Sequence, residues 1–486
     1  MLATRHLTLV GGRWHLRVAA SFTAWRPSRK QRYTAAATPA PVVDNEEKGK
    51  ERKVGLSLAQ EAKGGLIDLQ PPRGTRDFLP EDLRVRQWLF GEFEAVARLF
   101  GFEQFETPVL ESEALFTRKA GDEITQQLYN FEDKGGRRVA LRPELTPSLA
   151  RLVLAQAGRA ALPLKWFTIG QCWRYERTTR GRRREHYQWN MDIVGVPGVG
   201  AEAELLAAVC AFLQRVGLGP ADVVIKVSSR GVLSAVLARY AIPAAAVGPV
   251  AVVVDKMDKL PLAKVEEELA ALGVAADAAA GILAATQAAS LPELEALLGP
   301  GHEAITELRE LFALAEAYGI ADYLQFDASC IRGLSYYTGV VFEGRDRAGE
   351  LRAIFGGGRY DALLSTFGGE AQPCAGFGFG DCVIAELLKE RDLLPVPAHQ
   401  VEDLVVAMDE ALRPAAIAAA QRLRRAGRRV DLLLEPKKMK WVFKHAERCG
   451  AARLVLLAPE EWAAGAVRVK DLATREEVDV LVADLV

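Results

Sequence analysis

Apolar residues recur at helical spacing in the segment 84–100. They stand at Val85, Leu89, Phe93, Val96 and Phe100. Because this spacing puts them on one face, the pattern predicts an amphipathic helix. The segment Phe105–Leu110 (FETPVL) then reads as a strand, and its Pro108 suits an edge or an interface because proline cannot donate to a ladder. From residue 128 to residue 195 the pattern favours short strands.

Helical and strand patterns follow one another further along the chain. Residues 201–216 are rich in Ala, Leu and Glu and favour a helix, and residues 222–228 (DVVIKVS) predict a buried strand. Residues 231–321 have a similar composition with few turn signals. They predict a helical insertion that contains one internal strand, Pro249–Asp255. Strand character resumes at 323–343.

A small domain is predicted at the C-terminus. Pro395 and Pro397 follow a helical stretch and mark a linker. Residues 402–486 then alternate a strand (DLVVAM), a helix (411–426), a strand (VDLLL), a helix (437–449) and a strand (RLVLLA). This alternation predicts a small α/β domain with a parallel core.

Length and composition narrow the class of protein. The 486 residues suffice for about three domains. Hydrophobic residues make up 50% and charged residues 26%, as in soluble globular proteins. No apolar run reaches the ~18 residues that a membrane-spanning helix needs. The six cysteines form no Cys-x-x-Cys pair and the six histidines are scattered, which argues against a disulfide framework and against a metal site built from protein ligands.

The first 43 residues differ from the rest of the chain. They contain seven basic residues and no acidic one, and Asp44 is the first acid. This composition, filled with Ala, Ser and Thr, predicts an organellar transit peptide, and the alternative is a basic arm that binds nucleic acid. Removing seven positive charges from the net −1 leaves −8 for residues 44–486. A nucleic-acid ligand therefore needs a local basic patch. The charged run 45–53 reads as a linker.

One group of polar residues lies in the segment Leu141–Pro147 (LRPELTP). If 139–144 is a strand, Arg142 and Glu144 point to the same face. The Glu144 carboxylate and the Thr146 hydroxyl could accept hydrogen bonds from an ammonium group. An ordinary surface ion pair before a helix is the alternative, and this segment alone favours it.

The segment Phe167–Gly195 combines an arginine-rich loop with an alternating strand. The loop 174–184 holds six arginines and one acid, Glu176. In the strand after it, one face carries Tyr187, Trp189, Met191 and Ile193, and the other carries Gln188, Asn190 and Asp192. A polar face is usually the solvent face. Guanidinium groups bind phosphate bidentately, so the adjacent loop suggests a polyphosphate, an RNA, or both.

Two further segments carry candidate chemistry. In Cys330–Glu343 (CIRGLSYYTGVVFE), Arg332 precedes Tyr336 and Tyr337, of which only one can face the core if the segment is a strand. Phe355–Asp361 (FGGGRYD) is followed by Cys374–Gly380 (CAGFGFG), whose alternate glycines would let a flat ring or a backbone approach closely. The spacing fits neither a Walker A loop nor a dinucleotide fingerprint.

Together these segments resemble class II aminoacyl-tRNA synthetases, and specifically the histidyl-tRNA synthetase family, from about Pro72 to the C-terminus. Gly101–Leu110 resembles the first class II motif at the dimer interface, and Phe167–Gly195 resembles the second motif. Arg332–Tyr337 and Gly357–Asp361 resemble the two signatures of the histidine enzymes. Residues 402–486 resemble the anticodon-binding domain.

The resemblance implies an α/β (α+β) fold: an antiparallel-sheet catalytic domain with a helical insertion, and a C-terminal α/β anticodon-binding domain. The implied parts are a transit peptide and linker (1–65), the first part of the catalytic domain (66–230), the insertion (231–321), the second part of the catalytic domain (322–398) and the anticodon-binding domain (399–486).

The resemblance also implies roles for individual residues. Arg174 and Arg332 would contact the α-phosphate of ATP and serve catalysis, and Arg332 would also contact the substrate carboxylate. ATP would bind at Arg174, Glu176, Arg182 and Arg332. Histidine would bind through Glu144, Thr146 and Gln188 at its ammonium, Asp192 and Tyr337 at its imidazole, and Tyr336 as a wall of the pocket.

Two positions depart from the family pattern. Ser335 stands where the family usually has aspartate, and Val383 stands where the third motif ends in an arginine that holds ATP. Either another loop arginine, such as Arg182 or Arg184, supplies that charge, or ATP binds more weakly.

The implied activity is that of a histidine–tRNA ligase. It would use ATP with Mg²⁺, tRNA(His) and histidine, without a protein-held metal or a prosthetic group, as a homodimer that is not membrane-bound. The transit peptide places it in the chloroplast, the mitochondrion or both. The alternative is a catalytically inactive regulatory subunit of histidine biosynthesis. A plain RNA-binding or scaffold protein would not need the histidine-binding set, and another class II synthetase would lack RGLSYYTG.

Overall fold

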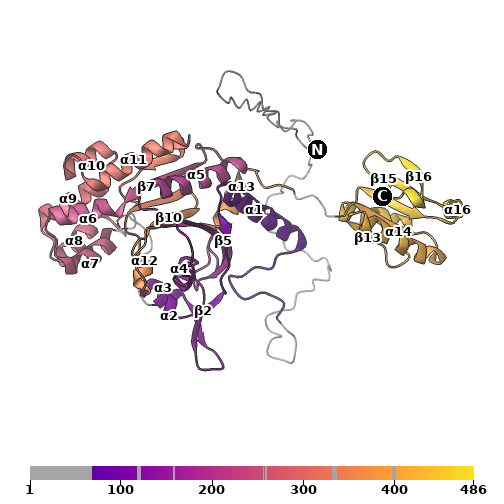
Figure 1. The fold of residues 1–486 in the computed structure, drawn as a ribbon, viewed down its shortest axis with the longest axis horizontal. Helices are drawn as coiled ribbons and strands as arrows, with labels where there is room; N and C mark the ends of the chain where they lie inside the picture. Colours follow the sequence, from indigo (N-terminus) through magenta and orange to yellow (C-terminus); the bar gives the residue numbers. More distant parts are fainter. Residues whose placement is uncertain are drawn as a thin grey trace, which may run out of the picture. The chain divides into compact units, whose positions relative to one another are not determined.

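The computed structural model describes residues 68–486 except 118–121, 157–158, 255–256, 258–259, 331–335 and 397–400 (Figure 1). The predicted transit peptide and the candidates Arg332 and Ser335 lie outside these residues. None of the helices in the described ranges combines the length and apolar composition that a membrane crossing requires.

An eight-stranded sheet forms the centre of the catalytic part. Its strand order is β1-β5-β6-β11-β10-β9-β7-β8, and the pairs from β5 through β7 are antiparallel. The short edge strands β1 and β8 pair in parallel with β5 and β7. The bounds are β1 Glu103–Gln104, β5 Leu164–Trp173, β6 Glu185–Val194, β7 Val223–Ser229, β8 Leu324–Phe326, β9 Val340–Asp346, β10 Phe355–Arg359 and β11 Cys374–Gly380.

Helices α1 (Pro80–Leu99), α5 (Gly200–Arg215) and α13 (Asp381–Glu390) pack on this sheet. The predicted helix 84–100 is therefore confirmed, and its apolar face enters the core. There Phe93 stacks on Trp189 of β6 with ring centroids 4.7 Å apart, and it meets Phe212 of α5 at the same distance. Burying these rings fixes α1 and α5 against β6, so that the opposite face of β6 is left for the site.

A three-stranded antiparallel sheet lies earlier in the chain. It has the order β2-β4-β3, with β2 Leu110–Ser112, β3 Tyr129–Glu132 and β4 Arg138–Leu141. The short helices beside it are α2 Ala114–Thr117, α3 Asp122–Gln127, α4 Thr146–Ala155 and α12 Leu363–Thr366. The predicted strand Phe105–Leu110 was wrong, because only 103–104 and 110–112 pair. Pro108 has no N–H to donate to a ladder in the stretch between them.

The interval 231–321 is helical, as expected. The helices are α6 Arg230–Arg239, α7 Ala244–Val254, α8 Leu262–Ala271, α9 Ala276–Thr286, α10 Leu291–Leu298 and α11 Glu303–Ala317, followed by the 3-10 turn η3 Ala321–Tyr323. Figure 1 shows them gathered beside β7. The predicted internal strand Pro249–Asp255 was wrong: its described residues belong to α7. Val250, Val253 and Val254 are buried at helical spacing, and a short apolar run does not distinguish the two structures by periodicity alone.

The C-terminal domain contains a five-stranded sheet of order β13-β12-β14-β15-β16. The parallel strands β12 (Asp403–Ala407), β13 (Val430–Leu432) and β14 (Arg453–Leu457) confirm the predicted parallel core. Two antiparallel strands that the sequence did not predict extend it, β15 (Ala466–Asp471) and β16 (Glu477–Leu481). The helical elements are η4 Glu410–Leu412, α14 Arg413–Arg425, α15 Met439–Cys449, α16 Pro459–Ala463 and η5 Val482–Asp484.

Candidate active site

Strand β6 presents its two faces as the sequence pattern predicted. Trp189 and Met191 are fully buried in the hydrophobic core, and Gln188, Asn190 and Asp192 lie on the other face. This polar face is not the solvent face, because Asn190 and Asp192 are also buried. It points instead over the neighbouring strand β11.

The alternate glycines of β11 make room for the polar side chains of β6. Gly376 pairs with Asp192 and Gly378 with Asn190 in the ladder. A Cβ at position 376 would fall far inside van der Waals contact with the Asp192 carboxylate, and one at position 378 would overlap the Gln188 amide. The glycine face therefore gives room to side chains of β6, and the close approach of a flat ring or a backbone to it stays a prediction.

A small pocket of 60 Å³ lies over this face. Its lining includes five of the six residues expected at histidine: Glu144, Thr146, Gln188, Tyr336 and Tyr337. Both tyrosines line the pocket. The strand alternation considered for Tyr336 and Tyr337 does not apply to them, because β9 begins at Val340.

Glu144 lies at one wall of this pocket. The Tyr336 hydroxyl donates to its Oε2 at 3.1 Å, and the neighbouring Thr146 hydroxyl accepts from the Asn190 amide at 3.3 Å. Burial raises the pKa of the Glu144 carboxyl, and the nearby Arg174 guanidinium opposes this rise. A cationic group in the pocket would favour the ionised carboxylate further.

Arg142 has a different role from Glu144. Strand β4 ends at Leu141, so the two do not share a strand, and both are buried. The Arg142 guanidinium donates to the carbonyl oxygens of Thr107 at 2.6 Å and Gln171 at 2.8 Å. The Arg142 guanidinium also pairs with the exposed Glu106 carboxylate at 3.0 Å, so an ion pair is present, but its cationic side is buried and not on the surface. Arg142 holds the chain around the site instead.

Asp192 lies behind this pocket beside Tyr360. The Tyr360 hydroxyl donates to Oδ1 of Asp192. Burial raises the pKa of Asp192 to about 7, against the stabilising effect of that hydrogen bond. The sequence analysis gave Tyr360 no role, although it belongs to the quoted segment FGGGRYD. Its neighbour Arg359 is structural, because its guanidinium is buried against Glu202 and the carbonyl oxygen of Gly198 at 2.8 Å.

Three acceptor atoms on this face lack a hydrogen-bond partner among the described residues. They are Oε1 of Gln188, Oδ1 of Asn190 and Oδ2 of Asp192. Native structures rarely leave buried polar atoms unpaired, and each one costs about 1–3 kcal/mol. Two of them belong to residues that line the pocket, and the third, on Asp192, lies behind it. Their number indicates that a ligand with several N–H donors completes the site.

A larger cavity of 570 Å³ shares part of its lining with this pocket. Arg174, Gln188, Gly356 and Gly378 line both, so the two spaces adjoin. Of the residues expected at ATP, Arg174, Glu176 and Arg182 line the cavity, and Val383 does so too. Arg184 does not. Its guanidinium lies over the Tyr175 ring at 4.0 Å.

Specific contacts hold several charged side chains of this cavity in place. Arg174 donates from Nε to the carbonyl oxygen of Pro143 at 2.9 Å and acts on the nearby Glu144 carboxyl, whereas Arg182 pairs with Glu176. His186, which the sequence analysis did not select, also lines the cavity. Burial, together with the charges of Arg174, Arg76 and Arg182, lowers the pKa of His186 to about 3, so its ring is neutral.

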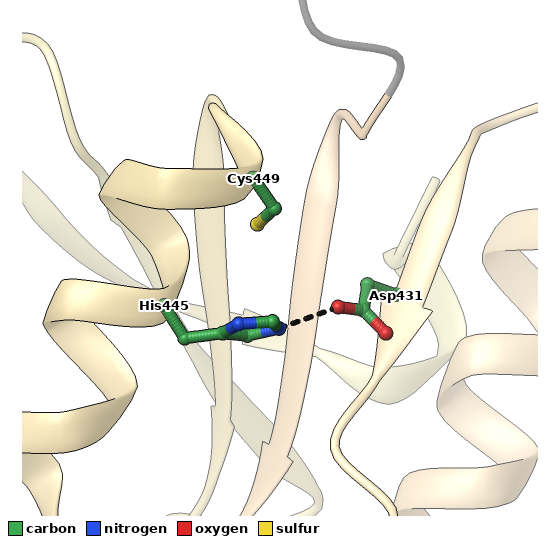
Figure 2. A group of neighbouring side chains, drawn as sticks. All are labelled: Asp431, His445 and Cys449. Carbon is green, nitrogen blue, oxygen red and sulfur yellow. Dashed lines mark hydrogen bonds and ion pairs between the residues drawn. The ribbon is translucent and has the colours of Figure 1, made fainter. Parts of the chain in front are cut away.

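Asp431, His445 and Cys449 form a cluster of side chains in the C-terminal domain (Figure 2). His445 Nε2 lies 2.8 Å from Asp431 Oδ2, and Arg448 lies 2.7 Å from Nδ1. Because a guanidinium only donates, Nδ1 accepts and Nε2 carries the proton that is donated to Asp431. Both ring nitrogens thus have hydrogen-bond partners, and the positive charge of Arg448 disfavours the binding of a metal cation at this cluster. These contacts hold α15 against β13.

Several basic residues of the C-terminal domain lie between positions 424 and 444. Arg424, Arg428, Arg429 and Lys437 have partners within the domain, such as Asp403 for Arg428. Lys438, Lys440 and Lys444 lie on or beside α15. This helix also exposes Trp441, whose ring stacks on His445 with centroids 4.8 Å apart. The surface therefore combines positive charge with an exposed aromatic ring.

Comparison with known proteins agrees with this geometry. The family model for histidyl-tRNA synthetase matches residues 74–380, and the model for an anticodon-binding domain matches residues 400–486. The chain is 56% identical over 419 residues to a chloroplastic/mitochondrial histidine–tRNA ligase of Arabidopsis thaliana, covering 86% of each chain. It is 38% identical to a histidine–tRNA ligase of Opitutus terrae, covering 85% of this chain and 96% of that relative.

A solved structure gives the same result for the fold. The histidyl-tRNA synthetase of Nostoc sp. PCC 7120 superposes with a TM-score of 0.70 at 26% identity, covering 86% of this chain and 98% of that chain. The class II fold expected from the sequence is therefore confirmed. With a family model that spans more than half of its length and a relative of this identity, the chain belongs to the histidyl-tRNA synthetase family.

Proposed function

We propose that the chain activates histidine with ATP to histidyl-adenylate and pyrophosphate, and then transfers the histidyl group to the 3′ end of tRNA(His). The observation that carries this proposal is the pocket with three unpaired acceptors beside an arginine-lined cavity. Histidine offers N–H donors at both its ammonium and its imidazole, and ATP offers the anionic phosphates.

In the small pocket, Glu144, Thr146 and Gln188 would accept from the ammonium group of histidine. Oδ2 of Asp192, which has no partner in the described residues, would accept from an imidazole N–H, and Tyr337 would also bond the ring. Tyr360 joins the set as the group that orients Asp192. Amino acids without such an N–H would leave these buried groups unpaired, which disfavours them strongly.

Adenylate formation brings two anions together. The histidine carboxylate attacks the α-phosphorus of ATP, a P–O bond forms, and pyrophosphate leaves with the electrons of the broken bond. Arg174 lies where the two spaces adjoin and would neutralise the α-phosphate there, with Arg332 as its expected counterpart. Orientation and charge neutralisation therefore account for the catalysis, and no protein nucleophile is needed.

Mg²⁺ would bind mainly to the phosphates. The cavity wall carries the carboxylates of Glu176 and Glu343, and carboxylate oxygens suit this hard cation. When bound, the ion would neutralise phosphate charge. Both carboxylates also pair with arginines, so ATP would bring most of the ligands itself.

The C-terminal domain would bind the anticodon stem-loop through α15. Unstacked bases of an RNA loop stack on aromatic side chains, and phosphates attract lysines. Trp441 with Lys440 and Lys444 offers both features. The chain would act as a homodimer.

The N-terminal segment would direct the protein to the chloroplast, the mitochondrion or both, with its soluble domains in the stroma or matrix. Its basic, acid-free composition and the chloroplastic/mitochondrial relative support this proposal. A reporter fused to residues 1–60 should enter one of these organelles. A reporter that stays in the cytosol would contradict the proposed targeting.

An inactive regulatory subunit is the second candidate. It is disfavoured by the match to the anticodon-binding model and by the arginines that remain around the cavity. The deciding experiment is ATP–pyrophosphate exchange by the purified full chain, with histidine and then with each other amino acid. Exchange that depends on histidine, followed by charging of tRNA(His), is expected. No exchange with histidine would favour the regulatory subunit.

A further inference from the structure

The larger cavity carries an excess of positive charge. Two glutamates and five arginines line it, so three positive charges remain uncompensated; the arginines are Arg174, Arg182, Arg183, Arg345 and Arg352. A triphosphate carries about four negative charges at neutral pH. These are opposite in sign to the positive excess of the cavity and similar to it in number. The contacts of each arginine indicate which of them can bind a phosphate group.

Contacts within the protein already occupy two of these arginines. Arg182 pairs with Glu176, and Arg345 pairs with Glu343. Taking either away from its glutamate would leave a carboxylate unpaired in the cavity wall, which costs free energy. Arg174 keeps its charge and lies next to the small pocket, where the α-phosphate would be.

Arg183 and Arg352 remain. Neither has a hydrogen bond or ion pair with another residue in the part of the chain that the structure describes, and both are exposed while lining the cavity. Unpaired arginines at a cavity wall are available to an anion without breaking an existing contact. Because a guanidinium binds phosphate bidentately, each can take up one phosphate group.

The backbone on both sides of Arg352 is fixed, although the side chain is free. The buried Asp346 carboxylate accepts from the backbone N–H of Glu350 at 2.9 Å and of Leu351 at 3.0 Å. After Arg352, Ile354 donates to Gly344 at 2.8 Å and accepts from Gly380 at 3.2 Å. The turn between β9 and β10 is therefore held in place, and Arg352 is presented to the cavity with little backbone entropy left to lose.

Arg183 lies in the loop between β5 and β6, and strand β11 separates this hairpin in the sheet from the β9–β10 hairpin that carries Arg352. Thr179 and Arg182 exchange backbone hydrogen bonds at 3.0 Å, and Arg184 N–H donates to Gly74 at 3.0 Å. Gly181 in the same loop packs against the Val383 side chain. The loop thus lies over Val383. Arg183 is the arginine of this loop that lines the cavity without a side-chain partner in the described residues.

We propose that Arg183 and Arg352 bind the β- and γ-phosphates of ATP from opposite sides of the cavity and supply the positive charge that Val383 lacks. This inference rests on the proposed function, because it needs ATP as the substrate. It also assigns that charge to a loop arginine other than the two named from the sequence, Arg182 and Arg184. Arg182 is held by Glu176, and Arg184 lies over Tyr175 outside the cavity lining. Arg174 stays with the α-phosphate.

The test uses the full chain with Arg183→Gln, Arg352→Gln and Arg352→Lys. The control is Arg347→Gln, which removes one charge from the same β9–β10 turn, but whose guanidinium donates to the carbonyl oxygen of Pro220 and does not line the cavity. Initial rates of histidine-dependent ATP–pyrophosphate exchange give KM for ATP, pyrophosphate and histidine separately. Inhibition by AMP reports binding of the nucleoside and α-phosphate alone.

Each glutamine variant should raise KM for ATP and for pyrophosphate about 10- to 100-fold, the range expected for one charge-assisted hydrogen bond. KM for histidine and inhibition by AMP should change less than about threefold, because those ligands lack the β- and γ-phosphates. Arg352→Lys should recover part of the loss, since the charge returns without the planar fork. Arg347→Gln should behave like the unmodified chain.

Any of three outcomes would overturn the assignment. The first is a KM for ATP within about twofold of the unmodified chain in both glutamine variants. The second is an equal effect of Arg347→Gln, which would mean that only the general electrostatic field of the cavity matters. The third is a loss of AMP binding in parallel with ATP binding, which would indicate a disturbed fold. Failure of the unmodified chain to catalyse exchange would instead refute the proposed function.

Discussion

Tyr360 donates its hydroxyl hydrogen to Oδ1 of Asp192, and Oδ2 of the same carboxylate has no partner among the described residues. One oxygen is thus fixed by the protein, and the other is the acceptor that we propose for the imidazole of histidine. A carboxylate held in this way has a defined orientation before the substrate arrives, which lowers the entropy lost on binding.

Tyr360→Phe should therefore weaken histidine binding, because it removes the hydrogen bond that holds Asp192. The lost hydrogen bond leaves Oδ1 of Asp192 unpaired and makes ionisation of that carboxyl harder. We expect KM for histidine to rise about tenfold, with KM for ATP changing less than about threefold. Tyr318→Phe, which removes a hydroxyl bonded to Glu204 on the surface, is the control. Equal effects on both substrates would contradict the orienting role.

Asp192→Asn should change how stability depends on pH. The pKa of Asp192 is raised to about 7 in the folded chain, against about 3.9 in an unfolded one. Between these values the unfolded chain releases the proton first, so the unmodified chain loses stability as pH rises from about 4 to about 7. Asparagine stays neutral and avoids this loss, which is on the order of 4 kcal/mol.

Thermal melting without histidine measures this effect. The Asn variant should melt above the unmodified chain at pH 8, and the difference should shrink toward pH 4.5. A difference that does not depend on pH would mean that Asp192 ionises as easily in the folded chain. The same variant should raise KM for histidine strongly and KM for ATP little, because it replaces the acceptor proposed for the imidazole.

Gly376→Ala should disable the histidine pocket through one methyl group. The added Cβ would overlap the Asp192 carboxylate and crowd the Tyr360 hydroxyl. Because β11 and β6 are paired at this position, the backbone has little freedom to move away. We expect histidine-dependent exchange to fall at least 10²-fold, about 3 kcal/mol, with the overall fold retained. Gly91→Ala, where a Cβ meets nothing within 4 Å, is the control. Exchange near the control level would show that β6 can shift.

Arg332→Ala tests the catalytic role expected of Arg332, which lies outside the described residues. If Arg332 contacts the α-phosphate in the transition state, its removal should lower ATP–pyrophosphate exchange by about 10²- to 10³-fold. Circular dichroism and the oligomeric state should stay unchanged. Exchange within about tenfold of the unmodified chain would refute the role.

Deleting residues 399–486 should separate the two half-reactions. Activation takes place at the arginine-lined cavity, so ATP–pyrophosphate exchange should persist if the remaining chain stays folded. Charging of tRNA(His) should fall severely, and the remaining tRNA binding should depend less steeply on salt because fewer phosphates are neutralised. Trp441→Ala in the full chain is a milder version that tests α15 directly. Unchanged charging by the truncated chain would assign another role to this domain.

The two faces of β6 and the glycine face of β11 could be predicted from the sequence, because strand alternation is a local rule. The residues of the histidine pocket came from the resemblance, and the structure brings five of them together. Tyr360 was missed because its hydrogen bond to Asp192 joins residues 168 positions apart, which no local pattern reports.

The partners of the arginines could not be predicted either. The sequence shows six arginines in one loop, but only the fold shows that Arg182 meets Glu176 and that Arg183 has no such partner in the described ranges. The strand predicted at Pro249–Asp255 failed for another reason. Its run of valines suits a strand by propensity, and burial among the neighbouring helices overrides that preference.

The glycines of β11 also limit how the amino-acid selectivity of this chain can drift during evolution. Every missense change in a glycine codon adds a Cβ, and at positions 376 and 378 that atom collides with the side chains that are proposed to read histidine. A shift to another amino acid would therefore require first a change on β6, at Gln188 or Asp192, and only then one on β11. A variant that carries only one of these changes would bind neither histidine nor the new amino acid well. Purifying selection should therefore keep both glycines fixed.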